Sequence, residues 1–555
     1  MFNPHAHGVV TGLLRTRWKR WLFLVVTGLC LVGCDGQPWN RPYPADSARD
    51  NVFYSLFQER PKHLDPAQSY SSNEVTFTGQ IYEPPLQYHY LKRPYQLIPL
   101  TATEVPVASY LGADGNKLAD DAAIDEIVYS VYDIHIQPGI MYQPHPAFAR
   151  DEQGTLRYQS LTEADLSGIH VLGDFRHTGT RELTAADYVY QIKRLAHPQL
   201  HSPIFGLMSE YIVGLEDYAG TLQTAAEASS GEQGAYIDLT QYPLAGAEVV
   251  DRYHYRIKVH GKYPQLLYWL AMPFFAPVPP EVERFYSQPG MKQRNITLDW
   301  YPVGTGPYML TINNPNRQMV MERNPNFHGE SYPVEGAAGD REAGLLDDAG
   351  KPLPFADKVI FSLEKETIPY WNKFLQGYYD TSGISSDSFD QAINIGAGGE
   401  VSLTDDMLEK GIDLSTAVST SIFYHGFNML DPVVGGYSEA ARKLRLAISI
   451  AINTEEYISI FLNGRGIPAQ GMIPPGIFGF VAGDAGINPY VYEPSPRGPV
   501  RKPIEVARRL LAEAGYPEGR DINTGKPLIL HFDTPQTGPD AKAQLDWLMK
   551  QFARL

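Results

Sequence analysis

Cysteine is nearly absent from this chain of 555 residues. The two present, Cys30 and Cys34, both precede residue 40. No disulfide bond and no cysteine-ligated metal site can therefore form in the rest of the chain. The hydrophobic content of 43% and the charged content of 20% are those of an ordinary folded protein, which excludes global disorder and collagen-like or coiled-coil architectures.

Positive charge is also in short supply. The chain has 46 Lys and Arg against 63 Asp and Glu, a formal net charge of −17. Four of the cations lie in the first 33 residues, so the remainder has 42 cations against the same 63 anions, or −21. A body this acidic repels phosphate backbones and no local basic patch offsets it, so we predict no nucleic-acid partner.

The signature motifs of several enzyme classes are missing. The chain has no Gly-x-x-x-x-Gly-Lys phosphate loop, no His-Glu-x-x-His and no Gly-x-Ser-x-Gly. Its 15 histidines are scattered, and adjacent acidic pairs such as Asp120 and Asp121 point apart on a helix or strand. A lipoprotein hydrolase would need a nucleophile with a positioned histidine, which the sequence does not offer. We predict a protein that is not an enzyme and has no cofactor and no metal.

The N-terminal segment has the pattern of a secretory signal. Four basic residues between positions 15 and 20 precede the apolar run Trp21–Val32, which at about 12 residues is too short to span a bilayer. The run ends in Leu31-Val32-Gly33-Cys34, which resembles the lipobox of bacterial lipoproteins. We therefore expect residues 1–33 to be a signal peptide and Cys34 to carry the lipid.

The residues after Cys34 bear on where the anchor lies. Residues 34–48 are polar and contain three prolines, which predicts a tether. Asp35 resembles the signal that keeps enteric lipoproteins in the inner membrane. No later run reaches about 18 apolar residues, so nothing beyond the anchor enters the bilayer. We expect a lipid-anchored protein on the periplasmic side of the cell envelope, with the cytoplasmic membrane favoured and the outer membrane as the open alternative.

Strand and helix patterns are interspersed, which indicates a mixed α/β protein. Thr184 followed by Asp187 has the spacing of a capping box, and residues 249–260 alternate as strands do. Further strands are predicted at 52–56, 308–312, 319–322, 359–363 and 422–428, and further helices within 75–88 and at 369–376, 438–451, 454–463, 503–514 and 545–555. The last helix is amphipathic but has no capping residue after it, so we expect a C-terminal stretch to be missing from this sequence.

The most unusual local sequence is Pro302-Val303-Gly304-Thr305-Gly306-Pro307-Tyr308. Two glycines fenced by prolines predict a tight turn whose backbone closely approaches another element, with an anion nest as the alternative. With Arg323-Asn324-Pro325-Asn326-Phe327-His328-Gly329 it resembles the family 5 solute-binding proteins of ABC importers, the peptide and nickel receptor group. Further matches follow in order at His63–Ala67, Ile81–Pro84, Leu183–Val189, Phe427–Asn428 and Ala469–Pro475.

The resemblance implies an α/β fold of the two-lobed periplasmic-binding-protein kind (type II, cluster C) with an extra smaller domain. We expect residues 49–90 and 245–355 to form lobe I, residues 91–244 an inserted second domain, and residues 356–555 an incomplete lobe II. A cleft between the lobes would close on the solute by a hinge motion.

The resemblance also implies a function in import. We expect a monomer that captures oligopeptides in the cleft and delivers them to an ABC permease in the inner membrane. Binding of nickel chelates or saccharides, and a non-transport sensor or scaffold on the same fold, are open alternatives.

Candidate ligand residues come from segments that the resemblance places at the lobe interface. They are Tyr70, Ser71, Ser72 and Asn73, with hydroxyls and a ring suited to peptide-like groups, the apolar Met272 and Phe274, and Tyr301 and Asn428. An ordinary surface turn is the alternative for residues 70–73, and core packing is the alternative for Met272 and Phe274. A cap or a turn explains Asp65, Thr184, Asp187 and Arg323, so we assign these residues to structure.

Overall fold

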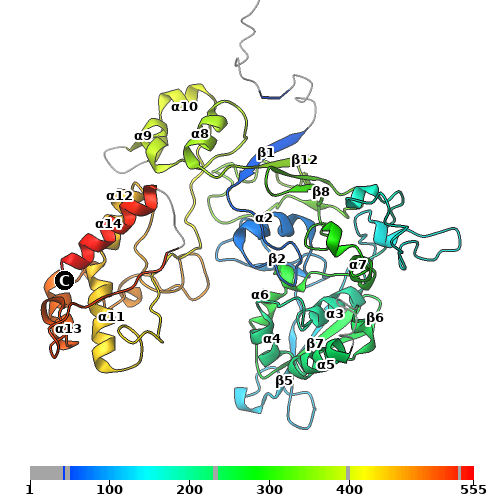
Figure 1. Ribbon diagram of the computed structural model, residues 1–555, viewed down its shortest axis with the longest axis horizontal. Coiled ribbons are helices and arrows are strands. Elements are labelled where there is room, and N and C mark those ends of the chain that lie inside the picture. The colour runs from blue at the N-terminus through cyan, green and yellow to red at the C-terminus, as the bar shows by residue number, and fades with distance from the viewer. Residues whose placement is uncertain (1–41, 44–50, 229–235, 396–400, 535–538) are drawn as a thin grey trace, which may run out of the picture. The chain divides into compact units, whose positions relative to one another are not determined.

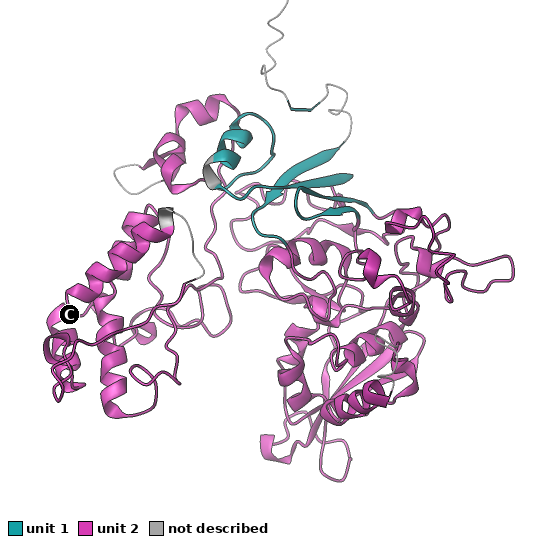
Figure 2. Cartoon of the chain, viewed as in Figure 1, with its two compact units in different colours: residues 1–60, 311–323, 356–383 teal, residues 61–310, 324–355, 384–555 magenta. Residues whose placement is uncertain are grey.

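The computed structural model describes residues 42–43, 51–228, 236–395, 401–534 and 539–555. The chain divides into two units, residues 1–60, 311–323 and 356–383 and residues 61–310, 324–355 and 384–555 (Figure 2). The expected signal peptide and Cys34 lie outside the described residues. Among the residues that are described, no helix is long and apolar enough to cross a membrane.

Most of a four-stranded sheet lies in unit 1. Its strands run in the order β1-β12-β9-β8 and cover Val52–Phe57, Lys358–Leu363, Gln318–Arg323 and Tyr308–Asn314. β1 runs parallel to β12, and β12 runs antiparallel to β9. The predicted hairpin at 308–322 and the predicted strand at 359–363 are confirmed, and the predicted helix at 369–376 is α8, Thr367–Leu375.

A second four-stranded sheet lies in unit 2. Its antiparallel strands run in the order β4-β5-β7-β6 and cover Ala108–Leu111, Tyr129–His135, His254–His260 and Ala247–Asp251. Alternate residues of β7 are buried, as the sequence pattern predicts, and α3 packs on β6 and β7 (Figure 1). The sheet combines strands from both sides of residue 245, where we expect a domain boundary, and the division into domains stays a prediction.

Six helices precede residue 287 in the described part of unit 2, and five of them contribute to the large core. They are α2 (Ser72–Ile81), α3 (Ala185–Arg194), α4 (Phe205–Tyr211), α5 (Leu215–Ala228), α6 (Leu266–Trp269) and α7 (Pro280–Tyr286). The predicted cap of α3 is confirmed, because the Thr184 backbone N–H donates to Asp187 Oδ2 at 3.0 Å. The large core runs from Ala67 to Val303 and includes residues from all six helices except α2.

Short strands and 3-10 turns complete the unit 2 segments before residue 356. The short strands are β2 (Leu86–Tyr88), β3 (Leu97–Pro99), β10 (Glu330–Ser331) and β11 (Pro352–Leu353). The 3-10 turns are Ile124–Glu126, Pro146–Phe148, Leu172–Asp174, Leu239–Gln241, Pro273–Phe275 and Lys292–Arg294.

The C-terminal segments of unit 2, residues 384–555, are built mainly from helices. They contain α9 (Phe389–Ala392), α10 (Asp405–Glu409), α11 (Glu439–Ala451), α12 (Thr454–Phe461), α13 (Ile504–Glu513) and α14 (Pro539–Ala553). Two short hairpins pair β13 with β14 and β15 with β16, at Ile393–Ile395, Val401–Leu403, Tyr492–Glu493 and Val500–Arg501. Three 3-10 turns lie at Ser386–Ser388, Asp484–Gly486 and Pro517–Gly519.

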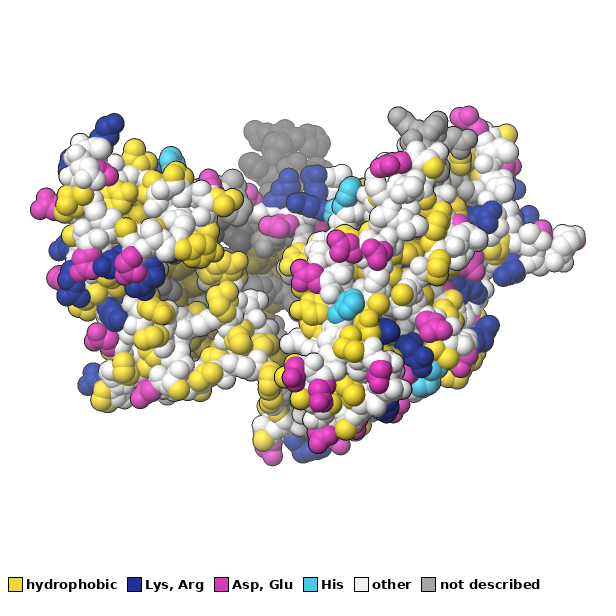
Figure 3. Space-filling view, turned by 90° about the horizontal axis from the view of Figure 1, so that it is seen from below, with side chains coloured by type: hydrophobic (Ala, Val, Ile, Leu, Met, Phe, Trp, Pro, Cys, Tyr) yellow, Lys and Arg dark blue, Asp and Glu magenta, His cyan; other side chains and the backbone are white. Residues whose placement is uncertain are grey.

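A small core joins α11 and α13. It consists of buried residues between Leu444 and Ala514, with Phe552 and Leu555 packed against it. Hydrophobic side chains also lie on the surface of these segments, as the left part of Figure 3 shows. The predicted helices starting at Ser438, Thr454 and Pro503 are confirmed, and the Ser438 hydroxyl accepts a bond from the Ala441 backbone N–H.

The prediction of a strand at 422–428 is wrong. The segment has no regular structure, and Phe423 is 94% exposed. A strand needs a neighbour for its backbone hydrogen bonds, and no strand within the described part of the chain pairs with this segment. Its aromatic composition alone was therefore misleading.

Candidate functional site

Glu74 fixes the loop that leads to Tyr70. Its carboxylate is buried and accepts four backbone N–H bonds, from Lys62 and His63 on Oε1 and from Tyr70 and Ser71 on Oε2, at 2.8–3.1 Å. Burial alone would raise the pKa of Glu74, but the backbone bonds stabilise the charged form more, so the pKa lies below its ordinary value. The loop from 62 to 71 is thus tied to the first turn of α2 at both ends.

A buried ion pair supports the same loop from behind. Arg194 of α3 donates to both oxygens of Asp65 at 2.9 and 2.6 Å, and its Nε donates to Glu283 at 3.2 Å. Burial would lower the pKa of Arg194, but the two carboxylates raise it above its ordinary value. Asp299 accepts bonds from the Leu64 and Asp65 backbone N–H groups, and burial raises its pKa. Removing Arg194 would leave the buried Asp65 carboxylate without its cation.

The glycine turn at 302–308 packs its backbone against the end of α2. The Gly306 N–H donates to the Ile81 carbonyl at 2.9 Å, and a Cβ on Gly304 would lie 1.9 Å from that oxygen. Asn324 Nδ2 donates to the Gly306 carbonyl at 2.9 Å, so the two motifs of residues 302–308 and 323–329 are in direct contact. These contacts favour a structural turn over an anion nest, because the N–H groups of Gly304 and Gly306 donate to Gln143 and Ile81.

The structure brings two of the predicted ligand residues, Tyr70 and Phe274, into contact. Tyr70 is 70% exposed, and its ring centroid lies 6.3 Å from that of Phe274. Met272, two positions before Phe274, is 40% exposed, whereas Phe274 is buried in the large core. Core packing therefore describes Phe274, and Tyr70 and Met272 remain available to a ligand. Ser71, Ser72 and Asn73 lie next to Tyr70, where α2 begins.

A second pair of exposed rings lies on α6 and β2 (Figure 1). The rings of Tyr268 and Tyr88 stack at 6.4 Å and are 44% and 41% exposed. The Leu86 N–H donates to the Leu270 carbonyl at 3.1 Å, which holds β2 against the segment that carries Tyr268 and Met272. We call the exposed residues Tyr70, Met272, Tyr268 and Tyr88 the apolar stripe.

The two other predicted residues make contacts of a different kind. Tyr301 is half-buried at the edge of the large core, its carbonyl accepts a bond from the Tyr286 hydroxyl at 2.6 Å, and burial raises the pKa of Tyr301. Asn428 is exposed, and its side chain accepts a bond from the Leu430 N–H, which closes a local turn. The structure gives both residues local packing or turn roles, and whether they also touch a ligand stays a prediction.

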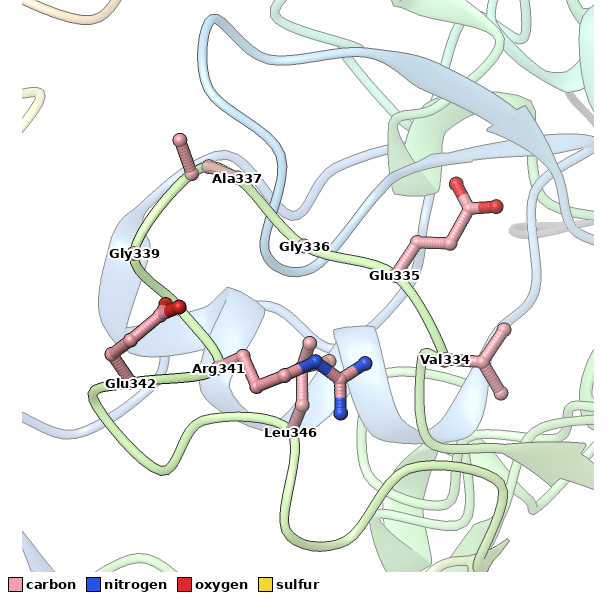
Figure 4. Close-up of a pocket in the computed structure, with 9 residues that line it drawn as sticks. Val334, Glu335, Gly336, Ala337, Gly339, Arg341, Glu342 and Leu346 are labelled. Carbon is pink, nitrogen blue, oxygen red and sulfur yellow. The ribbon is translucent and has the colours of Figure 1, made fainter.

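A separate hollow lies in the loop between β10 and β11. It measures about 440 Å³ and is lined by residues between Val334 and Leu346. The Arg341 side chain extends across the loop, and that of Glu335 points away from it (Figure 4). None of the predicted ligand residues lines this hollow. In the described ranges, no group of three or more His, Cys, Asp or Glu residues is arranged to hold a metal ion.

Comparison with known sequences places the chain in a family. Residues 177–555 match the sequence model of the bacterial extracellular solute-binding proteins, family 5, middle region. The match covers more than half of the chain. The chain belongs to this family.

Individual relatives in this family are distant. The glutathione-binding protein GsiB of Salmonella choleraesuis is 24% identical over 278 residues, which are 50% of this chain and 42% of that protein. A protein with the same printed name from Salmonella typhi gives the same values. The matched part thus spans less than half the length of these curated relatives.

Two solved structures of periplasmic binding proteins share the fold. The DppA protein of Helicobacter pylori, in complex with the peptide STSA, has 16% identity and a TM-score of 0.52 over 92% of this chain and 74% of its own. The oligopeptide-binding protein OppAIV of Borrelia burgdorferi has 16% identity and a TM-score of 0.50 over 91% and 73%. The predicted mixed α/β fold of the two-lobed family 5 binding proteins is confirmed.

Sequence reasoning missed one residue around this site that had a local signal, and others that had none. Glu74 had a readable signal, because Ser71 and Glu74 have capping-box spacing. Tyr88 and Tyr268 had none, because 180 positions separate them and only the fold brings their rings together. Arg194, the partner of Asp65, also depends on a contact between distant segments.

Proposed function

We propose that this protein is the solute-binding component of an ABC importer and that its ligands are oligopeptides. Membership of family 5 supports the first part. The second part is supported by the apolar stripe, whose rings and thioether are exposed. Its Tyr70 lies on the loop that Glu74 and the Asp65–Arg194 pair fix from behind, and its other residues lie on β2 and the α6 segment. Such a surface binds apolar side chains without reorganising, which keeps the entropy cost of binding low.

Capture and release would follow from closure of one lobe over the other. A ligand that contacts both lobes stabilises the closed form relative to the open form. The change in the free-energy difference between the two forms equals the difference in the ligand's binding free energy to them. The domain division given above, with lobe I, an inserted domain and lobe II, is part of this proposal. So is a lipid on Cys34, which would hold the protein beside its permease in the inner membrane.

Native mass spectrometry tests the ligand class. The full chain, purified without refolding, is sprayed intact, and any released small molecules are fragmented. We expect a heterogeneous set of added masses that fragment as peptides. The variant Glu74→Ala frees the Tyr70 loop and should carry fewer of them, whereas Glu163→Ala, at an exposed position outside the loop, should match the wild type.

Other outcomes would replace the proposal. A single added mass with the isotope pattern of nickel would favour a metal-chelate receptor, and hexose losses would favour a saccharide receptor. A protein that carries nothing and does not bind added peptides in calorimetry would overturn the oligopeptide assignment. Normal binding with no loss of peptide uptake on deletion would favour a sensor or scaffold.

A further inference from the structure

Tyr43 lies between Cys34 and the first strand, and its side chain is packed against unit 1. Its ring stacks on that of Tyr54 in β1 at a centroid distance of 3.8 Å. Its hydroxyl donates to the Tyr378 carbonyl at 2.8 Å, and the Tyr378 ring meets the Tyr43 ring edge-on at 6.5 Å. Burial raises the pKa of Tyr43 to about 12, as expected for a hydroxyl partly removed from water. Two separate segments of unit 1 therefore hold this one side chain.

The two segments that receive Tyr43 are joined to each other. The Tyr54 backbone N–H donates to Asp380 Oδ2 at 2.7 Å, and the Asp380 N–H donates to the Tyr54 carbonyl at 2.9 Å. The Tyr379 hydroxyl donates to Glu364, which follows β12, and both side chains are buried. Because β12 is the parallel neighbour of β1, the surface that receives Tyr43 is built on the unit 1 sheet.

The local sequence favours this contact. Tyr43 stands between Pro42 and Pro44. Proline has a fixed φ, and a residue before proline is restricted to extended backbone, so few conformations are open to the Pro-Tyr-Pro run. Docking such a run costs less conformational entropy than docking a flexible one, and aromatic surfaces are common receptors for proline-rich segments.

Holding Tyr43 shortens the chain that joins Cys34 to the body of the protein. Tyr43 is nine positions after Cys34, whereas Val52, where β1 begins, is 18 positions after it. A fully extended chain spans about 3.4 Å per residue, so the greatest reach falls from about 60 Å to about 30 Å. A shorter tether raises the effective concentration of the protein at a partner in the same membrane.

We propose that the contact of Tyr43 with Tyr54 and Tyr378, here called the Tyr43 clasp, fastens the tether to unit 1 and sets how far the protein can move from the membrane. The clasp is an intramolecular binding site whose occupant is the tether itself. Its effect on reach rests on the lipid on Cys34 that belongs to the proposed function. With that lipid, the clasp keeps its attachment point on unit 1 within about 30 Å of the bilayer, and release of Tyr43 doubles this limit.

Photo-crosslinking tests the clasp in the full chain, and it needs neither the lipid nor a peptide ligand. The variant Tyr43→p-benzoylphenylalanine places a photoreactive ring at the contact, and mass spectrometry identifies the crosslinked peptides. We expect most of the product to join position 43 to the peptide with Tyr54 or to the peptide with Tyr378. The control Tyr437→p-benzoylphenylalanine, at a 91% exposed position, should give no single dominant crosslink.

Energy transfer to the membrane tests the reach. The chain after Cys34 has no cysteine, so Asn316→Cys, between β8 and β9, takes a single donor dye in the lipid-modified protein. The vesicles are phosphatidylcholine with an acceptor dye on a small share of the lipids. We expect Tyr43→Ala to reduce the transfer at least twofold, because its tether is longer.

Two further variants of the labelled protein control for other causes. Tyr43→Phe keeps the stacked ring and should stay closer to the labelled parent than Tyr43→Ala does. Tyr437→Ala should leave the transfer unchanged. Thermal unfolding should show that each variant is folded.

The outcomes separate the clasp from the proposed function. Crosslinks from position 43 that are scattered, or that reach neither receiving peptide, would overturn the clasp, whatever ligand the protein binds. Unchanged transfer in Tyr43→Ala would overturn its role in setting the reach. A mature protein whose mass shows no lipid on Cys34 would overturn the anchor of the proposed function and the reach together, while peptide binding and the crosslink are judged on their own results.

Discussion

The two core regions of unit 2 differ in how completely they bury their apolar residues. The large core encloses side chains from four strands and five helices and contains the buried pair of Asp65 and Arg194. The small core joins mainly two helices, and around it Phe423, Leu430 and Tyr437 are each more than 90% exposed. A ligand surface needs fixed side chains, and among the described residues the large core has the more extensive set of buried contacts that can fix them.

The largest expected effect comes from a cavity in the large core. Phe285 is 2% exposed, with ring contacts to Phe175 and His145 at 5.2 and 5.4 Å. Phe285→Ala should cost about 4 kcal/mol, and Leu444→Ala in the small core about 2–3 kcal/mol, because a thin core relaxes into the space more easily. Hydrogen exchange read by mass spectrometry reports each region separately in the full chain. An equal loss in both variants would mean that the small core is as tightly packed as the large one.

Breaking the buried ion pair should come next. Arg194→Met leaves Asp65 and Glu283 buried without their cation, and we expect a loss of about 3 kcal/mol in the free energy of unfolding of the large core. Adding Asp65→Asn should restore part of it. The control Arg442→Met removes an exposed ion pair with Glu439 and should have no measurable effect. A loss no greater than that of the control would show that the pair does not stabilise the loop.

A smaller effect is expected at Glu74, and it depends on pH. Glu74→Gln should cost about 1–2 kcal/mol near neutral pH, because a neutral amide accepts the four backbone bonds more weakly. The folded pKa of Glu74 lies below the unfolded value of about 4.3, so this stabilisation is complete above the unfolded pKa and is lost as pH falls through the folded one.

Denaturant unfolding of wild type and Glu74→Gln over a pH series measures this difference. The two curves should converge at low pH, and Glu163→Gln at an exposed position should follow the wild type throughout. A gap that stays constant down to low pH would mean that Glu74 acts through packing alone.

The smallest effect is expected on the exposed surface near the small core. Phe423→Ser should change stability by no more than about 0.5 kcal/mol while it reduces binding of a hydrophobic dye. Val107→Ser changes an 85% exposed side chain in the region of the large core. Its effects on stability and dye binding are compared with those of Phe423→Ser. A loss above about 1 kcal/mol for Phe423→Ser would break the comparison, because it would mean that this side chain is buried in solution.

Local patterns predicted much of the fold. The cap at Thr184 and Asp187, the alternation in β7 and the Ser438 cap all involve residues within a few positions of one another, and each is confirmed. The strand expected at 422–428 failed for the opposite reason, since a strand depends on a neighbour that its own residues do not specify. The glycine turn was predictable as a close backbone approach, but its partner Ile81 was not.

The sequence by itself determined the family, through short motifs whose residues are adjacent in the chain, and it indicated Tyr70, Met272 and Phe274 as a group worth examining. Only the tertiary structure decided that Phe274 is buried, that the exposed rings of Tyr88 and Tyr268 stack, and that Arg194 is the partner of Asp65. The physical reason is that caps and turns depend on hydrogen bonds within a few residues. Contacts between distant segments depend instead on how whole faces pack, which no local pattern encodes.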